Sequence, residues 1–151
     1  MIPARALWSW SGRYYRVPEL MIEPHPTAPV PILCGGESPA ALRRAARLCD
    51  GWVGSAYTWE EAESYVRQLN TVRGDYRRGD EPFEIMLALR EPPSPDVYRR
   101  AEDIGVTGVM CSPWAGGDAV LSGNHDSFKL AAERYREPVE RFAETVIAKV
   151  R

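Results

Sequence analysis

The sequence predicts an α/β protein with a parallel sheet, because short apolar runs alternate four times with segments of helical periodicity. Strands that are joined through helices in this way form right-handed β/α/β units. The chain has 151 residues, of which 44% are hydrophobic, which is enough for one domain with a buried core. A complete (β/α)8 barrel takes roughly 250 residues, so four units amount to about half a barrel. A small open doubly wound sheet is the alternative.

The first segment, residues 1–29, is rich in proline and aromatic residues and is predicted to be an extended arm. Proline has no amide hydrogen and fixes φ, so neither a continuous helix nor a central strand fits this segment. The main domain is expected at 30–151. Its first strand is predicted at 30–34, where an apolar run typical of a strand buried on both faces ends at a pair of glycines, with Pro31 near its start.

The remaining elements are marked by caps and apolar stripes. Serine followed by proline opens two of the helices, at Ser38 and Ser94, because serine caps a helix and proline fits its first turn. A capping box at Thr58 and Glu61 opens the helix between them. Gly105 is expected to end the third helix. Strands are further predicted at 52–56, 83–89 and 106–111, a charged turn at 74–82, and a last helix with Pro138 near its start.

Charge and composition exclude several classes of protein. The chain carries 19 Lys and Arg against 21 Asp and Glu, a net charge of −2, which provides no broad positive field for nucleic acid or an anionic membrane. No apolar run approaches the ~20 residues that span a bilayer, and no secretory signal is visible, so we expect a cytoplasmic protein. Cys34, Cys49 and Cys111 are too widely spaced for a disulfide framework or a zinc site, and are expected to be small buried residues.

The turn after the first strand is the best candidate for a binding site, because sites in parallel α/β folds lie at the carboxyl ends of the strands. It consists of Gly35, Gly36, Glu37 and Ser38. The turn runs directly into a helix N-terminus, where free amides and the helix dipole attract an anion such as phosphate. Many strand-to-helix turns use glycine only for its conformation, so the residues alone leave both interpretations open.

Other strand ends are expected to share the same mouth. Arg90 follows the third strand and offers a fixed fork of donors to an anionic substrate or cofactor group, although such an arginine is commonly only solvated. Trp114 follows the fourth strand. Asp50 lies at the opposite end of the second strand and is assigned to packing. His25 and His125 have no nucleophile or carboxylate that spacing brings within reach, so no catalytic triad is predicted.

Several sequence motifs occur in a specific order. Residues 12–17 (GRYYRV), 29–36 (PVPILCGG) and 42–52 (LRRAARLCDGW) follow one another in the first part of the chain. In this order and spacing they resemble the carboxyl half of the luciferase-like monooxygenases, the bacterial-luciferase superfamily of flavin- and deazaflavin-dependent oxidoreductases. The members that use the deazaflavin coenzyme F-420 are also similar at residues 104–109 (IGVTGV), 113–114 (PW) and 139–147 (VERFAETVI).

The resemblance implies the carboxyl-terminal half of a TIM (β/α)8 barrel, with the four predicted strands as its fifth to eighth. It also implies that residues 35–38 contact the cofactor, FMN or coenzyme F-420, which favours the ligand interpretation of the turn. Family enzymes pass a hydride to or from the cofactor, or let reduced flavin activate oxygen, and so oxidise or reduce a small organic substrate. Arg90 and Trp114 are then expected on the substrate side.

The first four strands of the implied barrel are absent from this sequence. A half barrel leaves two unpaired strand edges and an uncovered inner face. We therefore expect a homo-oligomer, or a separate amino-terminal half as a partner, while a split or mis-started gene and an inactive remnant are the other outcomes. A hypothesis of a different class is a noncatalytic phosphate- or cofactor-binding or assembly module formed by dimerisation of half barrels.

Overall fold

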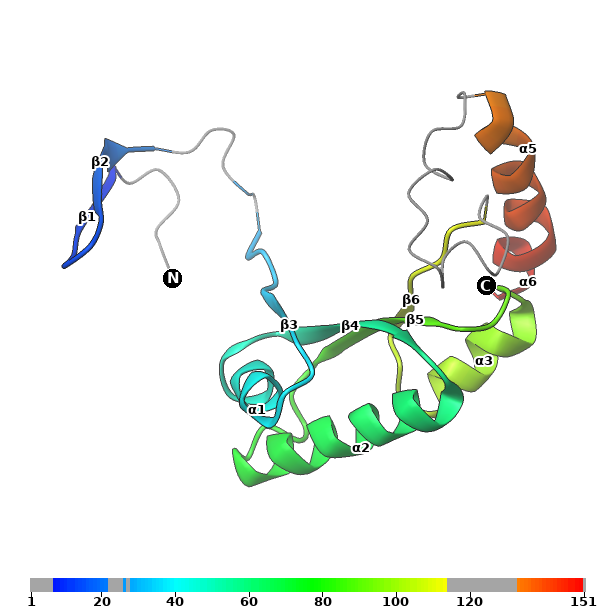
Figure 1. Ribbon diagram of the computed structural model, residues 1–151, viewed down its shortest axis with the longest axis horizontal. Coiled ribbons are helices and arrows are strands. Elements are labelled where there is room, and N and C mark those ends of the chain that lie inside the picture. The colour runs from blue at the N-terminus through cyan, green and yellow to red at the C-terminus, as the bar shows by residue number, and fades with distance from the viewer. Residues whose placement is uncertain (1–6, 22–25, 27, 114–132, 151) are drawn as a thin grey trace. The chain divides into compact units, whose positions relative to one another are not determined.

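In the computed structural model, residues 7–21, 26, 28–113 and 133–150 are described. The chain divides into two compact units, Met1–Pro31 and Ile32–Arg151 (Figure 1). The larger unit contains the sheet and its helices.

The smaller unit contains a β-hairpin that the predicted extended arm did not include. Strand β1 (Trp8–Ser11) pairs antiparallel with strand β2 (Arg16–Leu20), and the amide of Gly12 donates to the carbonyl of Tyr15 at 2.9 Å across the turn. Pro18 lies within β2, which a two-stranded hairpin tolerates because each strand keeps one free edge. The aromatic side chains of this unit are exposed.

The larger unit is built on a parallel sheet of four strands. These are β3 (Leu33–Gly35), β4 (Gly51–Tyr57), β5 (Glu84–Leu89) and β6 (Gly108–Val109), in the spatial order β3-β4-β5-β6. The prediction of four parallel strands is confirmed. Spatial order follows chain order without a reversal, whereas a doubly wound sheet reverses at its switch point. The described sheet is therefore wound in one direction, as in a barrel.

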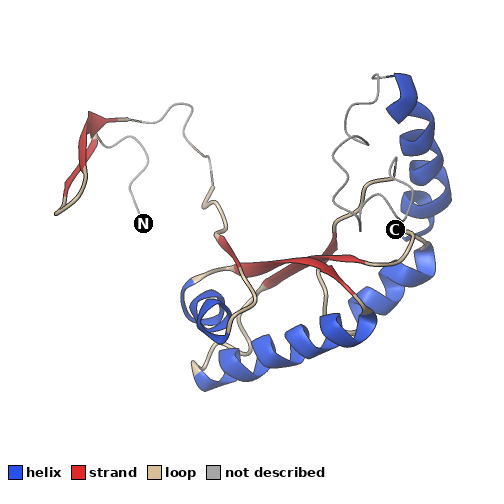
Figure 2. Ribbon diagram, viewed as in Figure 1, coloured by secondary structure: helices blue, strands red, loops and turns tan. Residues whose placement is uncertain are grey.

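Helices α1 (Pro39–Leu48), α2 (Trp59–Asp75) and α3 (Pro95–Asp103) lie on the same side of this sheet (Figure 2). All three begin at the predicted caps. The hydroxyls of Ser38 and Ser94 each accept a hydrogen bond from the third residue on, and Thr58 forms a complete capping box with Glu61. Gly105 follows Ile104, the C-cap of α3, and has φ +93°, which confirms it as the stop signal.

The core lies between the sheet and these helices. Its largest fully buried side chains come from α1, β4, α2 and β5, namely Leu42, Trp52, Leu69 and Leu87. The opposite face carries a different set of residues. The register places Gly35, Val53, Met86 and Gly108 in one row across all four strands, and each of them is exposed or only half-buried.

Two strand predictions need correction. The first strand begins at Leu33 and not at residue 30, and the prediction that it is buried on both faces is wrong, because Val30 and Ile32 are 63% and 64% exposed. β3 is an edge strand, so its flanking residues lack a neighbouring strand on one side. The fourth strand is shorter than the predicted 106–111, since only Gly108–Val109 pair with β5.

The last helical region also differs from its prediction. Helix α5 spans Glu133–Phe142 with Pro138 in its interior, and it continues into the π-helix η2 (Ala143–Ile147) and into α6 (Ala148–Val150). Pro138 is therefore not near the helix start. Residues 133–137 precede it in the helix, so the proline removes one interior backbone hydrogen bond.

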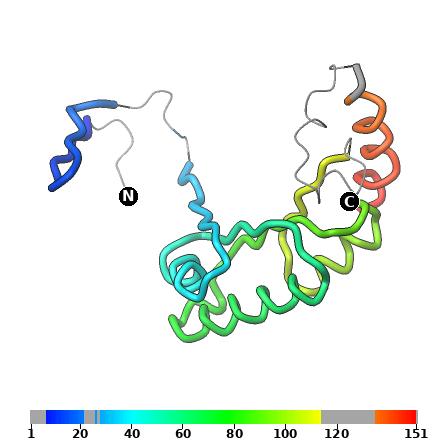
Figure 3. Tube along the Cα trace, in the orientation of Figure 1, coloured from blue at the N-terminus to red at the C-terminus, as the bar shows by residue number. Residues whose placement is uncertain are grey.

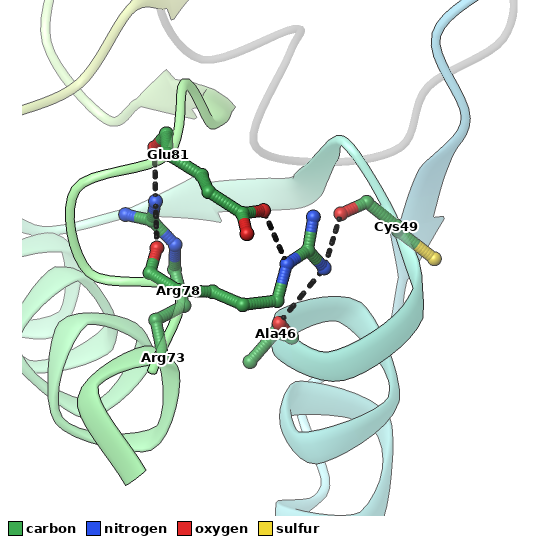
Figure 4. Close-up of polar contacts among 5 residues, drawn as sticks. All are labelled: Ala46, Cys49, Arg73, Arg78 and Glu81. Atoms are coloured by element: carbon green, nitrogen blue, oxygen red, sulfur yellow. Dashed lines mark hydrogen bonds and ion pairs between the residues drawn. The ribbon is translucent and has the colours of Figure 1, made fainter. Parts of the chain in front are cut away.

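Two arginines organise the segment that was predicted as a charged turn (Figure 4). Arg73, near the end of α2, is only 7% exposed, and its guanidinium donates to the carbonyls of Arg78 and Glu81 and lies 4.5 Å from the ring centroid of Phe83. Burial and the nearby Arg78 charge lower the pKa of Arg73. Arg78 in turn donates from Nη1 to the carbonyls of Ala46 and Cys49, at 3.1 Å each, and pairs with Glu81 at 2.6 Å. This network joins the ends of α1 and α2.

Replacing Arg78 with alanine would leave the last carbonyls of α1 and the Glu81 carboxylate without their donor. We expect the free energy of unfolding to fall by about 2 kcal/mol, the range for hydrogen bonds to a charged group, as measured by urea denaturation followed by circular dichroism. The matched control is Arg77→Ala, at an exposed neighbour, which should change the value by less than about 0.5 kcal/mol. Equal effects of the two substitutions would show that the network contributes nothing.

Candidate functional site

The turn between β3 and α1 lies where the sequence predicted it. β3 ends at Gly35, and α1 begins at Pro39 immediately after the cap residue Ser38 (Figure 3). The Ser38 hydroxyl accepts the amide hydrogen of Ala41 at 3.2 Å, so this side chain is committed to the cap. The chain therefore turns from the carboxyl end of a strand straight into a helix N-terminus.

The two glycines of the turn differ in how strictly the fold requires glycine at their positions. Gly36 has φ +103°, and a Cβ there would lie 2.9 Å from the Cβ of Ala41. Both the conformation and the space exclude a side chain at this position. At Gly35 a Cβ would make only ordinary contacts, 3.7 Å from Val53, so the fold itself leaves room for a small side chain.

Strand β4 fixes the turn through two aromatic side chains. Trp52, which is fully buried, donates from Nε1 to the carbonyl of Gly36 at 2.9 Å. The Tyr57 hydroxyl donates to Oε1 of Glu37 at 2.6 Å and accepts the amide hydrogen of Ser55 at 2.9 Å. Burial, followed by the hydrogen bond to Glu37, raises the pKa of Tyr57 far above its usual range. The phenol thus stays protonated and remains a hydrogen-bond donor to Glu37 even in alkaline solution.

The turn presents backbone donors at the start of α1. Among the described residues, the amide hydrogens of Glu37 and Ser38 have no hydrogen-bond acceptor. The first turn of α1 contains no acidic residue that would oppose an anion. The carboxylate of Glu37 is the one negative group next to these amides on the turn itself, and its Oε1 is held by Tyr57. Unpaired amides at the N-terminus of a helix are a feature that favours a nearby anion.

Arg90 lies at the same edge of the sheet, on the other side of the β4 end. Its amide donates to the carbonyl of Tyr57 at 2.8 Å, and its Nε donates to the carbonyl of Ala56 at 3.1 Å. The structure therefore brings Arg90 and the turn to the two sides of one strand end, while the Arg90 side chain itself is exposed. Trp114, the other residue expected on the substrate side, lies outside the described residues.

A cavity of about 430 Å³ opens beside Arg90. Trp59 donates to Glu91 at 2.5 Å on its wall, and the guanidinium of Arg100 lies 4.0 Å from the Trp59 ring centroid and 3.5 Å from Glu63. Of the charged residues on its wall, Arg100 and Glu63 pair with each other. The wall carries three glutamates against two arginines, so it has no positive excess that would attract an anionic ligand.

The other residues singled out in the sequence analysis are Asp50, His25 and His125. Asp50 accepts the amide hydrogen of Ile32 at 2.9 Å, which agrees with its assignment to packing. His25 and His125 lie outside the described residues. In the part of the chain that the structure covers, no group of three or more His, Cys, Asp or Glu is arranged to hold a metal ion, and no helix is long and apolar enough to cross a membrane.

Sequence reasoning missed the role of Tyr57 and the hydrogen bond of Trp52. Tyr57 is the last residue of β4, so the rule that sites follow strand ends could have found it. Trp52 gave no such signal, because a tryptophan at the start of a strand is indistinguishable from an ordinary core residue.

Comparison with known proteins agrees with this architecture. The profile of the family described as luciferase-like monooxygenase matches residues 4–91. Uncharacterized proteins of Mycobacterium tuberculosis and Mycobacterium bovis are 34% identical over 143 residues, which is 95% of this chain and 47% of each relative. An F420-dependent glucose-6-phosphate dehydrogenase of Nakamurella multipartita is 42% identical over 45 residues, 30% of this chain and 13% of that protein. The chain spans about half the length of the mycobacterial relatives.

The different constraints on the two glycines can be tested by alanine substitution. We expect Gly36→Ala to lower the free energy of unfolding by about 2 kcal/mol, because it forces a side chain into positive φ and against Ala41. Gly35→Ala should lower the free energy of unfolding by less than about 1 kcal/mol. Urea denaturation of both variants measures the difference, and a Gly36→Ala chain as stable as the Gly35→Ala chain would contradict the geometry described for the turn.

Proposed function

This chain belongs to the luciferase-like monooxygenase family, and we propose that it forms the carboxyl-terminal half of a flavin- or deazaflavin-dependent oxidoreductase acting on a small organic substrate. The turn 35–38 is proposed as the contact to the cofactor. The observation that carries the proposal is the set of amides at the α1 N-terminus, held by Trp52 and Tyr57 at the carboxyl edge of a parallel sheet.

The residues of the turn fit such a cofactor. FMN and coenzyme F-420 both carry a phosphate in the tail, and the amides of Glu37 and Ser38 are suited to an oxygen of that group. The row that starts at Gly35 continues through Val53 and Met86 on the sheet face away from the helices. These are small or apolar residues with partial exposure, suited to a flat ring. The short match to an F420-dependent enzyme favours the deazaflavin.

The described residues have distinct proposed roles. Gly35 and Gly36 allow backbone approach, and Ser38 contributes its amide, since its hydroxyl is used by the helix cap. Glu37 acts as a positioning residue, because its carboxylate holds the turn to Tyr57. The bound cofactor would supply hydride transfer or oxygen activation, and the protein would orient it and fix the charges around it. Arg90 is proposed to face the anionic part of a substrate, together with Trp114.

The sheet of the described residues has four strands, half the number of an eight-stranded barrel. β3 and β6 are its two edge strands, and the mycobacterial relatives are about twice as long as this chain. We propose that the chain is completed by a second copy or by a separate amino-terminal half, in a cytoplasmic setting. The second candidate function, a noncatalytic phosphate- or cofactor-binding module, is favoured by the same free amides, which bind phosphate without any ring chemistry.

Titration with FMN and with coenzyme F-420 tests the cofactor proposal. We expect the chain to shift the absorbance of at least one of them, and Gly35→Val to weaken this binding by about tenfold, or about 1.4 kcal/mol. A Cβ at this position makes only ordinary contacts, 3.7 Å from Val53, and the valine side chain would project into the proposed ring face.

The matched control is Gly79→Val, in a turn where a side chain meets nothing within 4 Å. It should bind as the unmodified chain does. Equal affinity of the Gly35→Val and unmodified chains would exclude the turn as the contact. Competition by inorganic phosphate without any ring-dependent shift would support the noncatalytic module instead.

Analytical sedimentation tests the proposal of association. We expect the chain to sediment as a dimer or larger species, because unpaired strand edges pair with other chains. Ile32→Lys, next to the β3 edge, should shift the population toward monomer, while Leu48→Lys, at a helix position with the same 64% exposure, should not. A cooperative, well-folded monomer in the unmodified chain would contradict this expectation.

A further inference from the structure

A cavity of about 340 Å³ lies between helix α3, the end of β6 and the C-terminal helical region. Such a volume is within the range of roughly 300–1,000 Å³ that small-molecule sites have. The helices on its two sides are attached to each other, since α6 lies beside α3 (Figure 1) and Arg99 of α3 donates from Nη2 to the carbonyl of Lys149 in α6 at 3.3 Å. The wall is thus formed by packed elements of the larger unit.

Most of this wall is apolar. The apolar side chains come from β6, the end of α5, η2 and α6, namely Val109, Phe142, Val146, Ile147 and Val150. None of the described residues that line the cavity is charged. A charged ligand would lose its hydration there without gaining a partner. The wall therefore favours a neutral and largely hydrocarbon ligand.

The polar part of the wall consists of Tyr98 and Cys111. The Tyr98 hydroxyl donates to Sγ of Cys111 at 3.3 Å, and the Tyr98 ring lies 6.4 Å from the ring of Phe142, measured between centroids. Burial, followed by the hydrogen bond to Cys111, raises the pKa of Tyr98, so the phenol keeps its proton. The Tyr98 oxygen still has lone pairs, and the Cys111 thiol still has a proton. Together they can accept from and donate to one hydroxyl group.

The helix that borders the cavity has an unusual form at this place. Residues Ala143–Ile147 form the π-helix η2 between two α-helical segments. Turns of π-helix are rare and occur frequently at functional sites. Val146 and Ile147, both in η2, line the cavity. The form of the helix is therefore an observation, separate from the volume of the cavity, that points to a ligand.

We propose that this cavity binds a neutral, mainly hydrocarbon molecule that carries one hydroxyl group, such as a medium-chain aliphatic alcohol. The hydrocarbon chain lies against the apolar wall, where its burial from water drives binding. The hydroxyl of the ligand donates to the Tyr98 oxygen and accepts from the Cys111 thiol. No bond is made or broken in this step, so the site is one of binding alone.

This site and the proposed cofactor face lie on different faces of the sheet. Val109 lines the cavity and pairs with Leu87, which is fully buried in the core. Gly108, one residue earlier in β6, belongs to the row that starts at Gly35. Side chains of successive strand residues point to opposite faces. The alcohol site can therefore be tested without any cofactor.

Protection of Cys111 from alkylation tests the proposal on the unmodified chain. Cys111 and Cys34 are both partly exposed, but Cys34 does not line the cavity. The chain is treated with iodoacetamide in the presence and absence of 1-octanol, and the alkylated peptides are quantified by mass spectrometry. At an octanol concentration of about four times the dissociation constant, alkylation of Cys111 should slow about fivefold, because only the unoccupied fraction reacts. Alkylation of Cys34 should keep its rate. Equal slowing of both thiols, or no slowing of Cys111, would overturn the proposal.

Calorimetric titration with 1-octanol gives the dissociation constant and tests the position of the site. Ile147→Trp places a large ring at a cavity position that is 41% exposed, and should weaken octanol binding by about tenfold. The matched control is Val139→Trp, at a position of α5 that is 42% exposed and does not line the cavity. It should bind octanol as the unmodified chain does. Circular dichroism checks that both variants keep their helices, and equal octanol affinities of the two would contradict this position.

A further variant and a second probe test the polar part of the wall. Tyr98→Phe keeps the ring and removes the hydroxyl, and should weaken octanol binding by about fivefold, the effect of one net hydrogen bond. Octanoate, which has a charged group in place of the hydroxyl, should bind the unmodified chain more weakly than 1-octanol. An unchanged octanol affinity in the Tyr98→Phe chain, or octanoate binding as tight as that of 1-octanol, would contradict the proposed ligand class.

Discussion

The hydrogen bond from Trp52 to the Gly36 carbonyl is the constraint on which the candidate site depends. Trp52 is fully buried and stacks on Tyr57 at 6.1 Å between ring centroids, so its indole has little freedom to move. Its donor therefore fixes Gly36 in a conformation that only glycine adopts easily. Because that carbonyl is directed to the indole, the amide hydrogen of Glu37, in the same peptide plane, points in the opposite direction. Tyr57 adds a second attachment at Glu37.

Much of the fold could be predicted from local sequence. The caps at Ser38, Thr58 and Ser94 were found because a cap needs only neighbouring residues to form its hydrogen bonds. The burial of each residue and its long-range contacts were harder to predict, because they depend on which strand lies at the edge of the sheet. The apolar run before Leu33 looked like a buried strand, but it borders an edge strand. Arg73 gave no local signal of its burial, which in the structure comes with hydrogen bonds to backbone carbonyls and a contact with the ring of Phe83.

In the candidate site, too, local features could be predicted from the sequence and long-range contacts could not. Gly36 and Ser38 could be singled out because glycine before a helix cap is a local signal. The contacts that hold the turn could not, because they join Trp52 to Gly36 and Tyr57 to Glu37 across the β3–β4 register. Long-range contacts of this kind become visible only when the register is known.

The central claim is that the amides after Gly36 receive the anionic tail of a cofactor. Amide nitrogen–proton NMR spectra of the chain, recorded during titration with FMN or coenzyme F-420, test it most directly. The account predicts that the largest shifts occur at Glu37 and Ser38 and at the indole of Trp52, which is bonded to the same turn. Shifts confined to other parts of the chain, with these three signals unmoved at saturation, would contradict it.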